Sequence, residues 1–368
     1  MLTRIICFVL FAVLVGGVFG QADSLNMKLV GVWELPDTAD TNERILGIEV
    51  LGNYLYALTL IEGVSFNIRV LNISDPSSPE LVNTEEGIAY LSGLFCGLGN
   101  YLYICRGPLQ LVIIDVSDPE DLELIDVDLG SSTASSKQLI PYSDRTGTYI
   151  ACRLDTALAG RRWGKIIIFD VTDPHSPELL DWSYVPEEVP DEPPDVVIQR
   201  IHQIAVKYPH LFVFETLAYA DTSSAGYTAT CPWVRMFDVR DLSLPPIEWT
   251  SGHYTIEVMA MRAVVAESLI YILEYGFSLL EYNDSSLTRI CTDLDYFDFH
   301  GVASGDTFYG RVDGPRVIAI RFVDCEPETL GYYYIIPGDA DYLLDYLLLK
   351  GDTIYAHSGN SIYIITWI

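Results

Sequence analysis

Short apolar runs, each followed by a polar turn, recur along the chain. The run Leu111–Leu124 reads L-V-I-I-D-V-S-D-P-E-D-L-E-L, and related copies begin at Ile68, Ile166 and Val234. Four or five largely apolar residues in a row favour a strand that is buried on both faces. The Asp-Pro pair after most copies predicts a tight turn, because proline fixes φ and aspartate accepts hydrogen bonds from backbone amides. A short second strand then follows, as at residues 80–82.

A second landmark alternates with these runs. Gly-Asn or Gly-Asp pairs stand at 52–53, 99–100, 305–306 and 351–352, each between two strand-like segments. Such pairs predict tight hairpins, because glycine adopts positive φ without steric cost. The strand after each hairpin carries an aromatic residue in a fixed register, and in the third unit Tyr149 lies two positions early. The aromatic residues are Tyr56, Tyr103, Phe212, Tyr271, Tyr309 and Tyr355.

Together the landmarks define a repeating unit of four strands. The aspartates that mark the turn lie at 75, 118, 173, 241, 284 and 324, with spacings of 43, 55, 68, 43 and 40. Periods of about 40–50 residues are typical of propeller blades. We therefore predict an all-β fold, a seven-bladed β-propeller of four-stranded antiparallel blades. Leu343–Leu348 has helical spacing, but its place before Gly351 predicts the first strand of the last blade.

The two ends of the chain predict how the ring closes. The last unit stops at Ile368, after its third strand, and residues 28–34 resemble a fourth strand with no third strand before it. Because an open ring would expose an unpaired apolar edge, we expect the N-terminal strand to complete the C-terminal blade. Residues 28–34 should then be the outermost strand of the blade that contains Ile364.

The repeated unit resembles the LVIVD-repeat family of exported prokaryotic β-propeller proteins. The resemblance is specific in the four units quoted above, which make up about half of the chain. It implies a propeller and a location outside the cytoplasm. No established catalytic residues of the family can be carried over to this sequence.

The first twenty residues have the features of an export signal. Arg4 precedes an apolar run from Ile5 to Val15, and Val18-Phe19-Gly20 forms a small-residue cleavage site. We expect cleavage near Gly20, and the alternative is an uncleaved anchor. No second stretch of spanning length follows, so we expect no membrane span in the mature chain. The signal predicts a secreted, periplasmic or cell-surface protein whose residues 27–368 form one propeller domain.

Charge and cysteine content limit the partners. The chain is strongly acidic, with a net charge of −30, which disfavours nucleic acid and anionic lipid. The acidity is compatible with Ca²⁺, but the marker aspartates lack the spacing of a calcium loop and are explained as turn formers. Six cysteines remain after signal cleavage, without C-x-x-C spacing, so a zinc site is not predicted. Their pairing stays open.

The two long spacings locate insertions in blades three and four. The extra residues fall between the second and third strands, at Arg153–Gly164 and Glu215–Pro232, where we expect loops. A Pro- and acid-rich segment, Pro186–Asp195, connects the two blades. In propellers these connections emerge on the same side, so we expect all three on one face, with Trp163 and Tyr227 on the same side of the disc.

Two groups of residues are candidates for binding. Counting back from the aromatic positions places a set of polar residues near the start of the innermost strands of four successive blades. Facing the channel, they would suit an anionic or hydroxylated ligand, although the same residues also suit a wet structural channel. This set is His202, Arg262, His300 and Tyr346. The second group, Arg161-Arg162-Trp163, combines residue types that are enriched at interfaces, and a solvated loop explains it equally well.

These observations favour a binding or scaffolding protein over an enzyme. Standard catalytic motifs such as G-x-S-x-G and H-E-x-x-H are missing, and the sequence identifies no catalytic residue and no metal ligand. We expect a monomer that binds a protein or glycan on the face of blades three and four and the channel mouth. The alternatives are a metal-dependent hydrolase or lactonase-like enzyme with its site in the channel, and a structural surface component. The cofactor is unknown, and fold alone does not identify a ligand.

Overall fold

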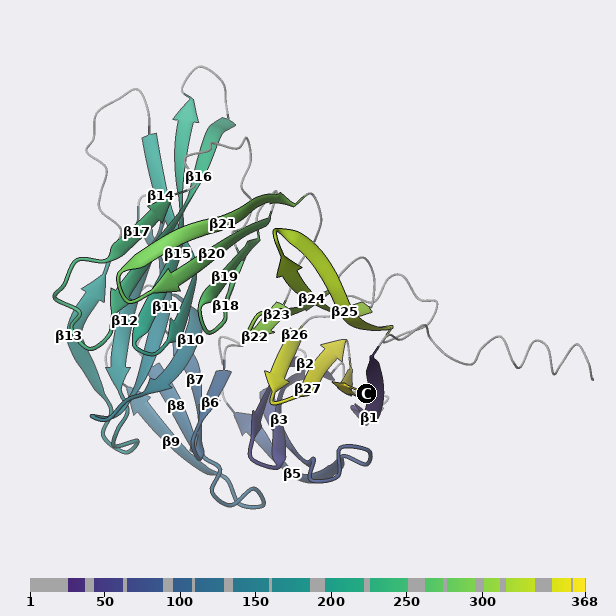
Figure 1. Cartoon of the computed structure of the whole chain (residues 1–368). Coiled ribbons are helices and arrows are strands. Elements are labelled where there is room, and N and C mark those ends of the chain that lie inside the picture. The colour runs from purple at the N-terminus through teal and green to yellow at the C-terminus, as the bar shows by residue number, and fades with distance from the viewer. Residues whose placement is uncertain are drawn as a thin grey trace, which may run out of the picture.

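The computed structural model describes residues 26–36, 43–61, 65–88, 95–107, 110–128, 135–158, 161–185, 196–221, 226–250, 262–273, 277–294, 301–311, 316–334, 346–358 and 360–367. Every regular element within these ranges is a β-strand. The strands form seven antiparallel sheets of four strands each (Figure 1). The predicted all-β class, the blade number and the four-stranded blades are confirmed.

Six blades are continuous in sequence and the seventh combines both ends of the chain. Blade one comprises β2 (Glu43–Leu51), β3 (Tyr54–Ile61), β4 (Ser65–Asn72) and β5 (Glu80–Ile88). Blade two comprises β6 (Phe95–Leu98), β7 (Tyr101–Gly107), β8 (Gln110–Asp115) and β9 (Glu123–Asp128). Blade three comprises β10 (Ser135–Ser143), β11 (Thr148–Leu158), β12 (Arg161–Asp170) and β13 (Glu178–Tyr184), and blade four comprises β14 (Val196–Lys207), β15 (His210–Asp221), β16 (Gly226–Asp238) and β17 (Ile247–Thr250). Blade five comprises β18 (Arg262–Val265), β19 (Leu269–Leu273), β20 (Phe277–Asn283) and β21 (Ser286–Leu294); blade six comprises β22 (Gly301–Ser304), β23 (Thr307–Arg311), β24 (Arg316–Val323) and β25 (Glu326–Tyr334); blade seven comprises β26 (Tyr346–Lys350), β27 (Thr353–Ser358), β28 (Ser361–Trp367) and β1 (Met27–Glu34).

The first strands of the blades form the inside of a closed ring. Each of β2, β6, β10, β14, β18, β22 and β26 contacts the first strand of the next blade, and β26 contacts β2. Seven buried clusters accompany this ring, and each joins side chains of two neighbouring blades. The core of the protein is therefore divided among seven interfaces between blades.

This division explains the continuous apolar runs of the sequence. In β8, Leu111, Val112, Ile113 and Ile114 are all buried, although neighbouring residues of a strand point to opposite faces. Val112 and Ile114 pack with blade one, whereas Leu111 and Ile113 pack with blade three. A blade between two others has no solvent-facing side, which confirms the prediction of strands buried on both faces.

The two predicted kinds of turn are both present. Gly52, Gly99, Gly305 and Gly351 have φ between 58° and 63°, the left-handed conformation that the hairpins were expected to need. The marker aspartates of the four specific repeats each accept a hydrogen bond from the backbone amide two residues further on: Asp75 from Ser77, Asp118 from Glu120, Asp173 from His175 and Asp241 from Ser243. The aspartates of these segments are turn formers.

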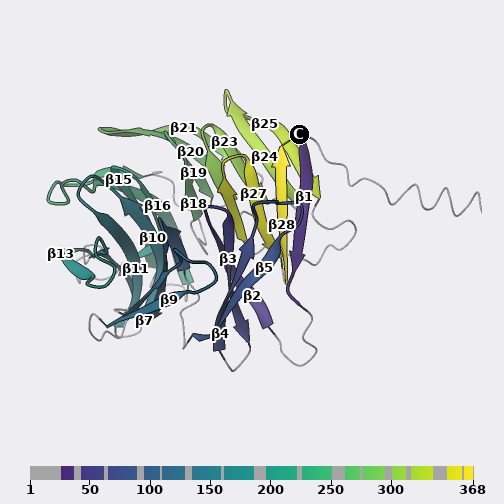
Figure 2. The same cartoon turned by 90° about the horizontal axis from the view of Figure 1, so that it is seen from below.

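The N-terminal strand closes the ring as predicted. Strand β1 pairs antiparallel with β28, with Met27 opposite Trp367 and Gly31 opposite Ile364, and it is the outermost strand of blade seven (Figure 2). Gly31 also permits close packing on blade one, because a Cβ at this position would lie 1.9 Å from the carbonyl oxygen of Pro76. Both ends of the described chain are thus held in one sheet.

The insertions of blades three and four differ from the expected loops. Most of Arg153–Gly164 belongs to β11 and β12, and most of Glu215–Pro232 belongs to β15 and β16. The extra residues lengthen the hairpins, because a paired strand satisfies backbone polar groups that a long loop would leave to water. Pro186–Asp195 lies outside the described residues. Tyr346–Lys350 is a strand, as its position before Gly351 predicted.

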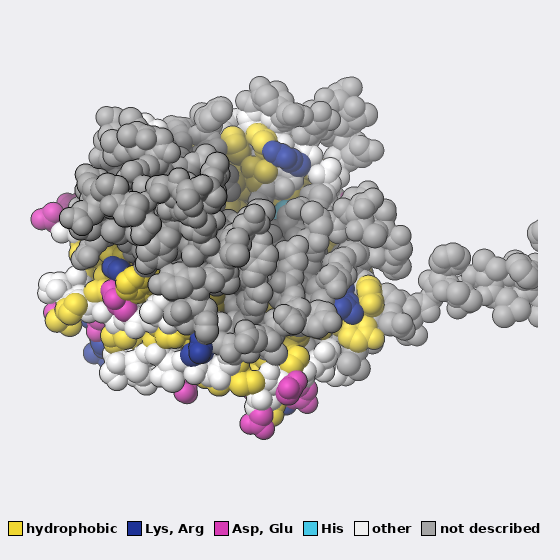
Figure 3. Space-filling view, turned by 90° about the horizontal axis from the view of Figure 1, so that it is seen from above, with side chains coloured by type: hydrophobic (Ala, Val, Ile, Leu, Met, Phe, Trp, Pro, Cys, Tyr) yellow, Lys and Arg dark blue, Asp and Glu magenta, His cyan; other side chains and the backbone are white. Residues whose placement is uncertain are grey.

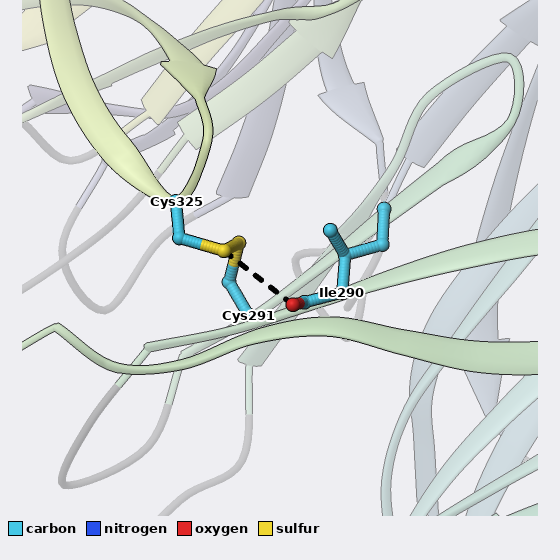
Figure 4. The surroundings of a disulfide bond; sticks show 3 residues. All are labelled: Ile290, Cys291 and Cys325. Carbon is cyan, nitrogen blue, oxygen red and sulfur yellow. Dashed lines mark hydrogen bonds between the residues drawn. A yellow bond between two sulfur atoms is a disulfide. The ribbon is translucent and has the colours of Figure 1, made fainter.

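Within the described residues, one disulfide joins two neighbouring blades. Cys291 of β21 is bonded to Cys325, in the turn between β24 and β25, and the Cys325 sulfur lies 3.4 Å from the carbonyl oxygen of Ile290 (Figure 4). Asp324 and Cys325 both have positive φ, of 51° and 69°. The bond therefore holds a turn whose backbone conformation is unfavourable for residues other than glycine.

Removing this disulfide is expected to destabilise the protein by about 3–4 kcal/mol, since the bond closes a loop of 34 residues. The variant Cys291→Ser/Cys325→Ser should show a lower urea midpoint than the oxidised wild type. A reducing agent should bring the wild type to the midpoint of the variant and leave the variant unchanged. Equal midpoints for the oxidised wild type and the variant would show that the bond does not constrain the fold.

Candidate functional site

The strand register relates the predicted channel residues to one another. Arg262 pairs with Leu273, and Tyr346 pairs with His357. Arg262 and Tyr346 each lie two residues before the residue of the same strand that pairs with the recurrent aromatic residue of the second strand. In blade four this position is Gln203, two residues before Ala205, which pairs with Phe212. The equivalent residues in the described blades are Gly47, Gln138, Gln203, Arg262 and Tyr346.

His202 is the bulge residue beside this position. Its Nε2 lies 2.6 Å from the hydroxyl oxygen of Thr216, which is buried in β15. His202 lies ten residues before Phe212, whereas Arg262 and Tyr346 lie nine residues before their aromatic residues, so the count along the sequence already placed His202 one position from the others. His300 lies outside the described residues, as do the side chains of Arg262 and Tyr346, so their direction stays a prediction.

The two glutamines of this ring bind the next blade. Gln138 donates to the carbonyl of Ile204 at 2.8 Å and accepts from its amide at 2.7 Å. Gln203 makes the same pair of bonds with Ala263, at 2.6 Å and 2.8 Å. Each side-chain amide thus replaces a peptide group between two inner strands. In blades three and four these positions hold the blades together at the channel.

A buried cluster of aromatic and charged side chains lies between blades three and four. The Nε of Arg235 on β16 is 3.5 Å from the carboxylate of Glu215 and 3.3 Å from that of Glu248. Its guanidinium carbon lies 4.9 Å from the ring centre of Trp233 and 5.5 Å from that of Tyr184, which is on β13 of blade three. Glu215 is 0% exposed, so this cation lies in a nearly dry environment.

The charges of this cluster are coupled to its aromatic groups. Burial and the neighbouring Glu215 carboxylate raise the pKa of the Tyr184 hydroxyl, which therefore stays protonated. The guanidinium stacks on two aromatic faces, an arrangement worth up to about 2 kcal/mol when it is desolvated. Phe237 contacts both Tyr184 and Trp182 and extends the cluster. The cluster fixes blade four against blade three directly below the long hairpin of β15 and β16.

Blade one carries an arginine at the same place in the repeat. Arg69, like Arg235, stands three residues before the turn residue that ends the third strand, and it forms an ion pair with Glu43 at 2.5 Å. Thr59 also donates to Glu43 at 2.5 Å. Burial acts to raise the pKa of Glu43, but the hydrogen bonds and the charge of Arg69 outweigh it and leave that pKa below its usual value.

Sequence reasoning missed both arginines, although a signal was present. In the repeats of blades two and three the equivalent residues are Val112 and Ile167, inside apolar runs. A charge within such a run implies a buried partner, because a lone buried cation is very unfavourable. The segments I-R-V-L-N and V-R-M-F-D thus carry the information. The acidic partners could not be identified, since they lie on other strands.

The residues Arg161, Arg162 and Trp163 begin strand β12. Trp163 pairs with Thr156 of β11, so the segment forms the end of the blade-three hairpin instead of a separate loop. Their side chains lie outside the described part of the structure. The predicted role of these residues in binding remains untested.

Two general properties concern the described residues only. No group of three or more His, Cys, Asp or Glu side chains in these ranges is arranged to hold a metal ion. In the same ranges there is no helix with the length and hydrophobicity needed to cross a membrane.

Comparison with known proteins agrees with the architecture. Residues 98–126, which span the second and third strands of blade two and most of the fourth, match the LVIVD repeat. The crystal structure of Sqt1 from Saccharomyces cerevisiae is similar, with a TM-score of 0.51 and 8% sequence identity, over 94% of this chain and 99% of that chain. At this identity the likeness concerns the fold alone. No curated protein matches the chain.

The protein is thus a seven-bladed β-propeller. More particularly, it is a propeller that carries an LVIVD repeat in its second blade.

Proposed function

We propose that the chain is an exported binding or scaffolding protein whose partner surface is the projecting end of blades three and four. The length of the blade-four strands is the observation that carries this proposal. Strands β14, β15 and β16 have 12, 12 and 13 residues, whereas the second strands of blades one, five, six and seven have 8, 5, 5 and 6. The four residues beyond an eight-residue strand correspond to about 13 Å.

This projection supports binding because the ring does not need it. Figure 1 shows β14, β15 and β16 extending beyond the neighbouring blades at one end of the molecule. Figure 3 views the molecule from that end, and the described part of this face shows hydrophobic side chains beside a Lys or Arg side chain. The cluster of Arg235, Trp233 and Tyr184 provides a rigid base for the hairpin, and rigid surfaces lose less entropy on binding.

Export is the second part of the proposal. The predicted signal at residues 1–20 supports it, and so does the disulfide between Cys291 and Cys325, since disulfides persist mainly in oxidising compartments. The acidic surface suits a soluble protein outside the cytoplasm. We propose that the mature protein begins near Gln21.

Site-specific photo-crosslinking in the producing organism tests the surface. A photoreactive amino acid at Trp163 or Tyr227 should give crosslinked adducts with a protein or glycan partner. The matched controls are Asn53 and Asp306, in the hairpins at the opposite end of blades one and six, and these should give none. Protease or glycosidase digestion of the adduct identifies the class of partner. Adducts that form equally at the control positions would contradict the proposed surface.

A further inference from the structure

A single carboxylate interrupts an apolar belt around the inside of the ring. Seven residues of the first strands are equivalent, because each pairs with the same position of the second strand of its blade. Six of them are apolar or a buried thiol, and one is charged. The belt consists of Glu49, Cys96, Ile140, Ala205, Val264, Val302 and Leu348.

Glu49 contacts three blades at the seam where the ring closes. Its Oε1 accepts from the Nζ of Lys350 in blade seven at 3.2 Å and from the amide of Val50 at 3.1 Å. Its Oε2 accepts from the amide of Gly97 in blade two at 3.2 Å. A Cβ on Gly97 would lie 2.7 Å from the Cγ of Glu49, so glycine leaves the space that this side chain occupies.

Stability alone does not explain a carboxylate at this position. Burial raises the pKa of Glu49, although Lys350 and the two backbone amides act in the opposite direction. Burial, together with the charge of Glu49, raises the pKa of the Cys96 thiol on β6. Apolar residues in place of a buried ion pair often give equal or greater stability.

The seam presents a problem of specificity that the pair can solve. All the blades have similar apolar faces, and blade one could in principle dock on blade six and leave blade seven outside. At the position equivalent to Lys350, blade six has Ser304, so this closure would bury Glu49 without a cation. The Glu49 side chain is 11% exposed and that of Lys350 is 43% exposed, so the carboxylate is the buried member of the pair. A buried carboxylate without its cation is unfavourable, and registry is the best-attested role of buried polar groups.

We propose that the Glu49–Lys350 pair fixes the number of blades, because it makes blade seven the favoured neighbour of blade one at the closing seam. The pair acts as a device for the register of closure, like a buried polar residue that sets the register of a coiled coil.

Refolding of variants from urea tests this proposal. Lys350→Leu alone should lower the urea midpoint, because it leaves the buried Glu49 without its cation. The double variant Glu49→Val/Lys350→Leu should recover the wild-type midpoint or exceed it. On refolding, however, the double variant should give several-fold more aggregated or trypsin-sensitive chains than the wild type, measured by size-exclusion chromatography and limited proteolysis.

A matched control uses the exposed pair of Arg321 and Glu328 in blade six, whose side chains are 39% and 50% exposed. Replacing both by leucine should leave the fraction of correctly refolded monomer unchanged. The proposal is overturned if the Glu49→Val/Lys350→Leu variant refolds to monomer as completely as the wild type. It is equally overturned if Lys350→Leu alone leaves the midpoint unchanged.

Discussion

A chain that ends before Ser361 is expected to lose the whole cooperative fold, not one blade of it. The deletion removes β28, which lies between β27 and β1 in blade seven. Ile362, Ile364 and Ile365 of this strand are 1%, 1% and 0% exposed. Burial of three such side chains contributes about 5–9 kcal/mol, a range comparable with the whole stability of a typical domain.

The effect should extend across the ring because the missing strand belongs to two interfaces. Ile362 and Ile364 pack against blade one, and Ile365 packs against blade six. Strand β1 also loses its only partner among the described strands. We expect the truncated protein to show no cooperative thermal transition by circular dichroism. A melting temperature equal to that of the full-length chain would contradict closure through β1 and β28.

A circular permutant distinguishes the effect of losing strand β28 from the effect of moving the ends of the chain. Met27 lies opposite Trp367, so a short hairpin can connect the end of β28 to the start of β1. A permutant that begins at residue 35 and carries residues 26–34 after this hairpin contains four consecutive strands in blade seven. It should melt close to the wild-type temperature, because every native strand pair is retained.

The fold could be predicted because its signals are local and repeated. Each signal depends on a few neighbouring residues: a glycine in a hairpin, an aspartate in a turn, or an apolar run that is buried on both faces. The regular spacing of these signals along the chain then defines the blades. The extension of β15 and β16 could not be predicted in the same way. Its residues, such as the segment T-A-T-C-P at 228–232, have the composition of a loop, and only pairing across the hairpin makes them strands.

The candidate site depends on contacts between blades, and the sequence does not reveal which residues of neighbouring blades are in contact. Tyr184 and Arg235 are neighbours in space but lie on blades three and four. The bulge at His202 depends on the backbone of β14 and leaves no mark in the residue types. The repeat predicts which strand a residue is on, whereas its partner across the blade interface is decided by packing. This is why the arginine cluster was not found from the sequence, whereas the ring of polar residues at the channel stays a prediction.

Loss of the positive charge between blades three and four should have the largest effect of any single substitution considered. Arg235→Met leaves the carboxylate of Glu215, which is 0% exposed, without its guanidinium. Removing one partner of a buried ion pair costs about 3–5 kcal/mol. The stacking of the guanidinium on Trp233 and Tyr184 is lost as well. Urea denaturation, followed by tryptophan fluorescence, measures the change.

Two further variants decide whether the charge is responsible. Arg240→Met removes an exposed arginine of the same blade, whose partner is Asp238 at the end of β16, and should leave the urea midpoint unchanged because water screens this pair. Arg235→Met/Glu215→Leu removes both buried charges and should recover much of the lost stability. If the double variant is no more stable than Arg235→Met, the loss comes from packing of the guanidinium on the rings, and the carboxylate contributes little.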